Sequence, residues 1–329
     1  MTAAAIVGVV AASVGAAAGP PPPPTAAGGQ TVAVLAQGVP TPTAFAFGLG
    51  QVFVAAFGDE RNPKIHGGVY TVREGRAVRV PGSPRLAFGL AFGHGTLYVS
   101  TGFGPTVRIV AWSRWDGTRF RKQRVVARGP KGFSGFNGIA LGPDGRLYTG
   151  VSLGDAKTAD YEHGQTPYAN SFLAIDPKTG KLELLATGMR QPWQPIFVPG
   201  LPGPLVSDLG QESLGKKRPP DRLLVVQPGL DFGFPDCPAR PKTCSQYAKP
   251  FALFPAHSSP VGLGSVGKRL YVALFNGTGK GPDVVSMPTS GGSYKPFLTG
   301  FVAPVVAVGA HGGQLYVGDL TGAIYRVKP

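Results

Sequence analysis

The chain has 329 residues, and its 50 glycines and 34 prolines together make up about a quarter of it, whereas only 15% of the residues are charged. This composition excludes a helical bundle and a coiled coil and favours short strands joined by tight turns, and the hydrophobic content of 43% argues against a disordered chain. The formal net charge of +15 arises from 32 basic residues against 17 acidic ones, which favours contact with polyanions and keeps a protein in solution.

The amino-terminal segment resembles an export signal. Residues 1–58 contain no charged side chain, and a run of small apolar residues precedes the prolines at 20–24. Ala16 and Ala18 have the spacing of a signal-peptide cleavage site, although no basic residue precedes the apolar run. We therefore interpret residues 1–30 as either an export signal or a flexible tail rich in Ala and Pro, and export would make the protein secreted or extracytoplasmic. No segment is expected to span a membrane.

Cys237 and Cys244 are the only cysteines, and six residues lie between them in a segment rich in proline. Two cysteines alone cannot complete a tetrahedral zinc site. A local disulfide between them is expected in a protein that is exported to an oxidising compartment.

A repeated unit runs through the chain from residue 31 onwards. Each unit has a Gly-rich apolar strand, a tight turn of the kind found in hairpins, and a second strand that contains an aromatic or aliphatic residue followed by Val or Thr. These pairs are Phe53-Val54, Tyr98-Val99, Tyr148-Thr149, Leu205-Val206, Tyr271-Val272 and Tyr316-Val317. Their spacing of roughly 45 to 65 residues matches one propeller blade with loops of variable length, and six units fill the chain.

The two ends of the chain predict how the ring of blades closes. The last unit has only three strands, the third of which ends at Val327, and residues 31–36 form an isolated strand near the other end. Pairing of these two segments would complete the last sheet and remove an open edge. The sequence therefore predicts an all-β, six-bladed β-propeller over residues 31–329, with its last blade closed by an N-terminal strand.

Functional residues are expected on the channel face, by which we mean the end of the ring that carries the loops between second and third strands and the crossings between blades. The expected loops are 59–67, 154–171, 208–221 and 275–281, and the expected crossings are 133–137, 189–194, 256–262 and 300–304. The five histidines are scattered, and no two of them have the spacing of metal ligands.

Three stretches stand out by their motifs. They are Gly-Met-Arg-Gln-Pro-Trp at 188–193, Ser-Asp-Leu-Gly-Gln-Glu at 207–212 with Pro-Pro-Asp-Arg-Leu-Leu at 219–224, and Gly-Leu-Asp-Phe-Gly-Phe-Pro-Asp-Cys at 229–237 with Pro-Ala-His-Ser-Ser-Pro at 255–260. In order and spacing they resemble the soluble quinoprotein glucose dehydrogenases, especially the bacterial L-sorbosone dehydrogenase-like branch of that family. The resemblance is strongest over residues 185–265, and as a six-bladed propeller it extends over 31–327.

The resemblance implies a pyrroloquinoline quinone (PQQ) cofactor, a calcium ion and the oxidation of a sugar or aldehyde. Arg190 and Gln191 match positions that bind the quinone, although Gln191 stands where the family has asparagine. The backbone carbonyls of Gly210 and Gln211 match the pair that binds calcium, with Asp208 beside them as a further candidate ligand. Oxygen donors of this kind suit a hard cation.

Several positions depart from the family pattern. The general base of the family is a histidine, and Ser134 stands at its position, where a hydroxyl without its own base is a poor proton acceptor. The catalytic residue is therefore unassigned, with His257 and His163 as candidates. Asp283 stands where the family has a lysine, and Ala303 or one of its neighbours, Val302 and Pro304, stands where it has an arginine. Two cations that would pair with the quinone carboxylates are therefore missing. Each such contact is worth about 1.5–3 kcal/mol.

Two functions stay open at the level of sequence. One is the PQQ-dependent oxidation of a sugar or aldehyde, and the other is a non-catalytic family member that has lost the quinone site and binds a carbohydrate or another polar ligand. The candidate residues also have structural interpretations, in which Arg190 pairs with Asp208 and His257 forms a structural hydrogen bond. The acids of loop 154–171 either gather a calcium ion or are solvated.

Seven basic residues lie between Arg114 and Lys131 and alternate in part with apolar ones. They are interpreted either as charges that keep an outer edge strand from aggregating or as a surface that binds anionic polymers weakly. No recognition element for a specific nucleic acid is evident. The partner that the resemblance implies is a small sugar or aldehyde, and weak polyanion binding is a further expectation.

Overall fold

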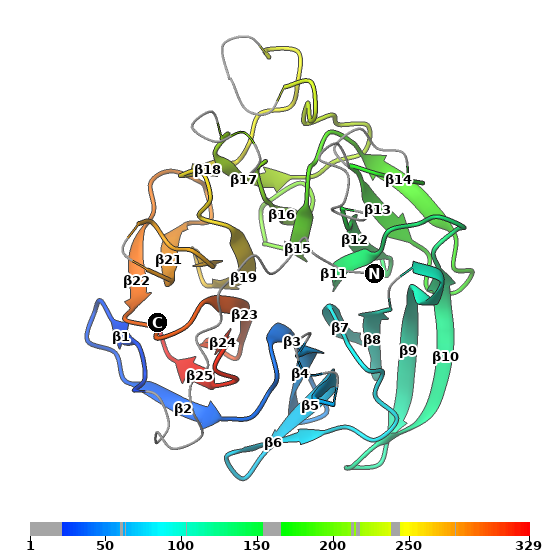
Figure 1. Cartoon of the computed structure of the whole chain (residues 1–329), viewed down its shortest axis with the longest axis vertical. Helices are drawn as coiled ribbons and strands as arrows, with labels where there is room; N and C mark the ends of the chain where they lie inside the picture. Colours follow the sequence, from blue (N-terminus) through cyan, green and yellow to red (C-terminus); the bar gives the residue numbers. More distant parts are fainter. Residues whose placement is uncertain are drawn as a thin grey trace.

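The computed structural model describes residues 22–59, 62, 64–102, 104–153, 166–211, 214, 218–237, 244–279 and 281–329. Within these residues, six antiparallel sheets surround a central axis like the blades of a propeller (Figure 1). The prediction of an all-β, six-bladed propeller is confirmed. No helix in the described ranges is long and apolar enough to cross a membrane.

Each blade has four main strands, which lie side by side from the centre of the ring outwards. Blade one contains β3 (Pro42–Gly48), β4 (Gln51–Gly58), β5 (His66–Arg73) and β6 (Arg76–Arg79). Blade two contains β7 (Gly89–Gly93), β8 (Thr96–Thr101), β9 (Arg108–Trp115) and β10 (Phe120–Arg128), with the short 3-10 helix η1 (Gly104–Thr106) before β9. Blade three contains β11 (Phe136–Leu141), β12 (Leu147–Val151), β13 (Phe172–Ile175) and β14 (Leu182–Ala186). Blade four contains β15 (Pro192–Ile196), β16 (Leu205–Asp208), β17 (Asp221–Val225) and β18 (Ala252–Phe254). Blade five contains β19 (Pro260–Val266), β20 (Arg269–Leu274), β21 (Asp283–Pro288) and β22 (Lys295–Thr299), followed by β1 (Thr25–Ala26). Blade six contains β23 (Val305–His311), β24 (Gln314–Asp319), β25 (Ile324–Val327) and β2 (Val32–Ala36).

The ring closes by pairing the two ends of the chain. β2 lies antiparallel to β25 and completes blade six, with Val32 opposite Val327 and Val34 opposite Tyr325. The predicted closure by an N-terminal strand is therefore confirmed. The pairing of β1 with β22 at the edge of blade five was not predicted from the sequence. The N-terminal segment thus contacts two adjacent blades and joins them.

The hydrophobic core lies between neighbouring blades, where the faces of adjacent sheets pack on each other. Between blades one and two, the fully buried ring of Phe53 lies 5.5 Å from the ring of Trp115 and 5.6 Å from that of Phe120, measured between ring centroids. Aromatic pairs at such separations add about 0.5–1.5 kcal/mol beyond the burial of their area. Interfaces of this kind hold the blades in place around the axis.

The innermost strands approach one another so closely that some positions require glycine. A Cβ added at Gly89 of β7 would lie 2.5 Å from the backbone nitrogen of Ile139 in β11. A Cβ added at Gly262 of β19 would lie 2.6 Å from the backbone nitrogen of Val308 in β23. Both distances are shorter than van der Waals contact, which explains why Gly-rich segments form inner strands.

Cys237 and Cys244 form the predicted disulfide, with their Cα atoms 6.0 Å apart. The bridge lies in the segment between β17 and β18, shortly after the buried ring of Phe232. It is consistent with an oxidising, extracytoplasmic environment.

Candidate functional site

Blades four and five bring most of the predicted site residues to one end of the propeller. Pro192 at the start of β15 pairs with Asp208 at the end of β16, so the crossing before β15 and the loop after β16 lie at the same end. Pro260 at the start of β19 pairs with Leu274 at the end of β20 in the same way. At these two blades, the crossings and loops of the channel face therefore lie together.

Arg190 lies in the crossing before β15 and is largely buried, with 7% of its surface exposed. Its Nη1 donates a hydrogen bond of 2.7 Å to the carbonyl oxygen of Gly210, in the loop after β16. The backbone nitrogen of Gly210 in turn donates a hydrogen bond of 2.6 Å to Oδ1 of Asp221. A guanidinium therefore contacts the carbonyl that the resemblance to the quinoproteins assigns to calcium.

Asp208 is fully buried and forms an ion pair with Arg222, the second residue of β17. Its Oδ2 accepts hydrogen bonds from Nε of Arg222, at 3.1 Å, and from Nη2, and its Oδ1 accepts one of 2.8 Å from the backbone nitrogen of Gln191. Nη1 and Nη2 of Arg222 also donate to the carbonyl oxygens of Phe232 and Gly188, respectively. The ion pair thus links β16, β17 and the crossing before β15.

Gln191 joins blade four to blade three. Its side-chain oxygen accepts a hydrogen bond of 2.7 Å from the backbone nitrogen of Leu153, which follows β12. Its backbone oxygen accepts one of 3.3 Å from the backbone nitrogen of Leu209. Asn137 makes a similar connection, because its Nδ2 donates a hydrogen bond of 2.6 Å to the carbonyl oxygen of Pro192. Both side chains are buried, so polar groups tie the blades together at this end.

Asp221 is a site residue to which the sequence assigned no role. Its Oδ2 accepts a hydrogen bond of 2.7 Å from the backbone nitrogen of Ser259, in the crossing before β19, while its Oδ1 accepts the one from Gly210. Asp221 therefore connects blade four to blade five. The sequence feature that points to Asp221 is its position in Pro-Pro-Asp at 219–221, where an acidic residue begins a buried strand.

His257 lies in the same crossing as Ser259, and its side chain is exposed. Both residues have positive φ, 69° and 53° respectively, a backbone conformation that non-glycine residues adopt only when their surroundings impose it. Asn276, in the loop after β20, donates a hydrogen bond of 3.2 Å to Oγ of Ser259. The imidazole is thus carried on a constrained turn at the channel face.

Ser134 and Asp283 stand at two of the positions that depart from the family pattern. Ser134 is half-buried, and its hydroxyl donates a hydrogen bond to the carbonyl oxygen of Ser152. Asp283 begins β21 and is 4% exposed, and Thr278 donates a hydrogen bond of 3.2 Å to its Oδ2. Burial raises the pKa of Asp283 to about 6. Where the resemblance expects a lysine, the protein therefore has a buried carboxyl.

The structure does not describe every predicted site residue. His163 and three loop acids, Asp155, Asp160 and Glu162, lie outside the described residues. Gln211 is described, and 9% of its surface is exposed. In the part of the chain that the structure describes, no group of three or more His, Cys, Asp or Glu side chains is arranged to hold a metal ion.

No protein-family model matches the sequence, and the comparison with curated proteins gives no match. The fold, in contrast, is similar to those of several solved structures. One is described as an oxidoreductase (glucose dehydrogenase) from Thermus thermophilus, with 21% identity, a TM-score of 0.71, and coverage of 91% of this chain and 100% of that chain. Another is the PQQ-bound form of an aldose sugar dehydrogenase from Streptomyces coelicolor, with 20% identity, a TM-score of 0.70, and coverage of 93% and 99%.

A third similar structure is a carbohydrate-active enzyme of family AA12 from Trichoderma reesei, with 17% identity, a TM-score of 0.74, and coverage of 93% of this chain and 97% of that chain. At these identities the likeness is one of fold. The chain is therefore structurally similar to the six-bladed propellers of the soluble glucose and aldose sugar dehydrogenases.

Proposed function

We propose that this protein binds a sugar or a related aldehyde at the channel face of blades four and five, and that it does so without a quinone. Solved structures with the same fold include two sugar dehydrogenases and a carbohydrate-active enzyme, which supports a sugar as the ligand. The exposed imidazole of His257 and the half-buried side chains of Asn276 and Thr278 supply donors and acceptors for hydroxyl groups.

The charges at the channel face count against PQQ. The quinone carries three carboxylates, and anions that leave water need cations or several hydrogen-bond donors. The guanidinium of Arg222 is neutralised by Asp208, and that of Arg190 donates to Gly210. Asp283 adds a buried carboxyl. These residues of blades four and five therefore do not fit the quinone, and no reaction step is assigned to it.

The hydrogen bond from Arg190 to Gly210 is the observation that carries the proposal of a site without calcium and quinone. Calcium binds oxygen ligands at about 2.3–2.6 Å, and the guanidinium already approaches the Gly210 oxygen to 2.7 Å. Two like unit charges about 4 Å apart repel by about 4 kcal/mol at an effective dielectric constant of about 20, and a divalent ion doubles this repulsion. Calcium at this carbonyl would therefore require Arg190 to move away.

Quinone-dependent oxidation of a sugar or aldehyde is the second candidate. The observation that favours it is the exposed imidazole of His257 on the crossing before β19, because imidazole is the side chain best suited to exchange a proton near neutral pH. One of the similar folds belongs to a PQQ-bound sugar dehydrogenase, which makes the quinone the cofactor to test.

Calorimetric titration with a panel of aldoses and aldehydes tests the proposal. PQQ with calcium is titrated in parallel, and dye reduction is assayed over the same panel. We expect heat of binding from at least one sugar, with neither PQQ binding nor dye reduction. Tight PQQ binding with turnover would replace the proposal by the second candidate. The lack of binding to every compound, PQQ included, would refute both.

His257→Gln and His94→Gln form a matched pair of variants for this titration. Both histidines are exposed and have positive φ, 69° and 50°, but His94 lies in the hairpin turn between β7 and β8, at the opposite end of its blade. We expect His257→Gln to weaken sugar binding about three- to tenfold through the loss of one hydrogen bond, and His94→Gln to leave it unchanged. Equal effects of the two substitutions would place the sugar elsewhere.

A further inference from the structure

A surface rich in basic residues lies on the outer edge of blade two. β10 is nine residues long, and five consecutive residues in its middle are exposed. We use the term basic edge for Arg121, Lys122, Arg124 and Arg128 of this strand together with Lys131 of the crossing that follows it. At a rise of about 3.4 Å per residue, the four positions on β10 extend over roughly 25 Å.

The amount of charge on the outer strand differs between blades. Charges on an outer strand keep sheet edges apart, although a short strand or a covered edge achieves the same without them. The outer strands β14, β18 and β2, together with β22 and β1 at the edge of blade five, contain one glutamate and one lysine. The outer strand β6 contains two arginines, of which Arg79 binds carbonyl oxygens of its own blade. The positive charge is therefore a property of blade two and not of outer strands in general.

Much of the basic edge has no acidic partner. Asp116 is the single acid between residues 108 and 131, and it forms an ion pair with Arg121. Arg124 donates a hydrogen bond of 2.8 Å to the carbonyl oxygen of Pro177. Across the ranges that the structure describes, no ion pair involves the other three members of the basic edge. These three cations can bind external anions without breaking an ion pair among the described residues.

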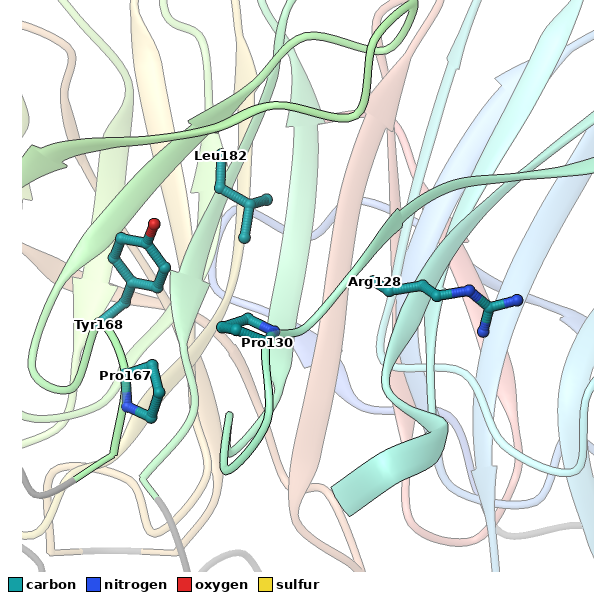
Figure 2. Close-up of a pocket in the computed structure, with 5 residues that line it drawn as sticks. All are labelled: Arg128, Pro130, Pro167, Tyr168 and Leu182. Atoms are coloured by element: carbon teal, nitrogen blue, oxygen red, sulfur yellow. The ribbon is translucent and has the colours of Figure 1, made fainter.

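A depression with a volume of about 610 Å³ adjoins the basic edge where β10 ends. Its walls are Arg128, Pro130, Pro167, Tyr168 and Leu182 (Figure 2). In Figure 2, the tyrosine, the prolines and the leucine lie on one side, and the guanidinium of Arg128 extends to the other side. Tyrosine and proline rings have flat apolar faces that suit the C–H face of a sugar ring, and the volume is of the size that small ligands occupy.

The structure around Tyr168 fixes the position of its ring at the wall of this depression. Tyr168 and Asn170 both have positive φ, 58° and 55° respectively. The Tyr168 ring packs edge-on against the Phe133 ring, with 6.5 Å between the ring centroids, and this contact restricts the position of Tyr168. Non-glycine residues in this conformation cost free energy, so the surrounding structure must hold this turn in place.

We propose that the basic edge and the adjoining depression bind an acidic polysaccharide of the polyuronate type. Its carboxylates would lie along β10, and one of its sugar rings would lie against Tyr168. The site goes beyond the sugar site of blades four and five, because it lies on blades two and three and shares none of its residues. Single-stranded nucleic acids stack successive bases on several aromatic side chains, whereas Tyr168 is the one aromatic wall of the depression among the described residues, which favours the polysaccharide.

Calorimetry with polygalacturonate tests the proposal on the full chain, with neutral dextran and single-stranded DNA as comparison polymers. The main variant is the triple substitution Lys122→Gln/Arg128→Gln/Lys131→Gln. We expect it to weaken polygalacturonate binding about tenfold at low ionic strength, because each exposed charge pair contributes about a factor of two. Binding by the unsubstituted protein should also weaken as salt screens the charges, and dextran should not bind.

The control variant Lys268→Gln/Lys295→Gln/Arg326→Gln removes the same number of lysines and arginines from exposed positions on blades five and six. It should change the affinity less than about twofold. A second variant, Tyr168→Leu, removes the aromatic face and should weaken polygalacturonate binding severalfold. Equal losses in the two triple variants would show that the net charge alone attracts polymers, and so would overturn the proposal. Tighter binding of DNA than of polygalacturonate, with Tyr168→Leu without effect on the latter, would assign the surface to nucleic acid instead.

Discussion

Replacement of Arg222 by methionine would leave the carboxylate of Asp208 buried without its charged partner. Asp208 is fully buried, and Arg222 donates to its Oδ2 from both Nε and Nη2. The same guanidinium also donates to the carbonyl oxygens of Phe232 and Gly188, which would lose these donors. Removal of one partner of a buried ion pair costs about 3–5 kcal/mol. We therefore expect Arg222→Met to lower the free energy of unfolding by about 4 kcal/mol.

Urea unfolding of the purified variant measures this loss, and two further variants make the result specific. Arg146→Met is the control, because Arg146 pairs with Asp144 and Glu183 at the surface, where the side chains are 34–55% exposed. Exposed ion pairs contribute at most about 1 kcal/mol. The double variant Asp208→Asn/Arg222→Met should regain part of the loss, since it no longer buries an unpaired charge.

Two outcomes would refute the reasoning. If Arg222→Met cost no more than Arg146→Met, the pair between β16 and β17 would not be a buried ion pair in solution. If the double variant were no more stable than Arg222→Met, the loss would come from the carbonyls of Phe232 and Gly188 and not from the charge of Asp208.

Three further predictions concern a buried acid, the disulfide and the core. Burial raises the pKa of Asp283 from 3.8 to about 6. Between these two pH values the native state holds a proton that the unfolded state has released, so the free energy of unfolding falls as the pH rises from one value to the other. Asp283→Asn should therefore increase the free energy of unfolding by up to about 3 kcal/mol at about pH 8 and by little at about pH 4, and an equal gain at both values would contradict the assignment. Cys237→Ser should lower the free energy of unfolding by about 2–3 kcal/mol, because the bridge joins residues separated by 7 positions, and wild-type protein with its disulfide reduced should show the same loss. Phe53→Ala should cost about 3–5 kcal/mol in chemical denaturation, because the ring is fully buried between blades, whereas Leu49→Ala in an exposed turn should cost less than about 0.5 kcal/mol.

Most of the features that the sequence predicted correctly depend on residues close together in the chain, and the closure of the ring is the exception. A hairpin forms where turn residues such as Gly-Leu-Gly at 48–50 separate two apolar runs, and that chemistry is present in the sequence itself. Six such units predicted six blades, and the isolated strand at 31–36 predicted the closure with β25. The disulfide followed from the presence of only two cysteines.

The contacts at the candidate site depend on tertiary structure. Arg190 and Gly210 were both predicted on the channel face, and the structural interpretation of Arg190 paired it with Asp208. The structure instead shows a hydrogen bond from Arg190 to the carbonyl oxygen of Gly210. Asp208 pairs with Arg222, because the position of β17 beside β16 brings Arg222 to it.

The outer edges of the blades also show the difference between what the sequence predicts and what the tertiary structure decides. The sequence by itself determined that residues 114–131 are basic, because charge is a property of composition. Only the tertiary structure decided that these charges adjoin a depression lined by residues from blade three, and that β1 pairs with β22. Strands and turns arise from interactions between near neighbours, whereas the packing of one blade against the next determines which distant side chains meet.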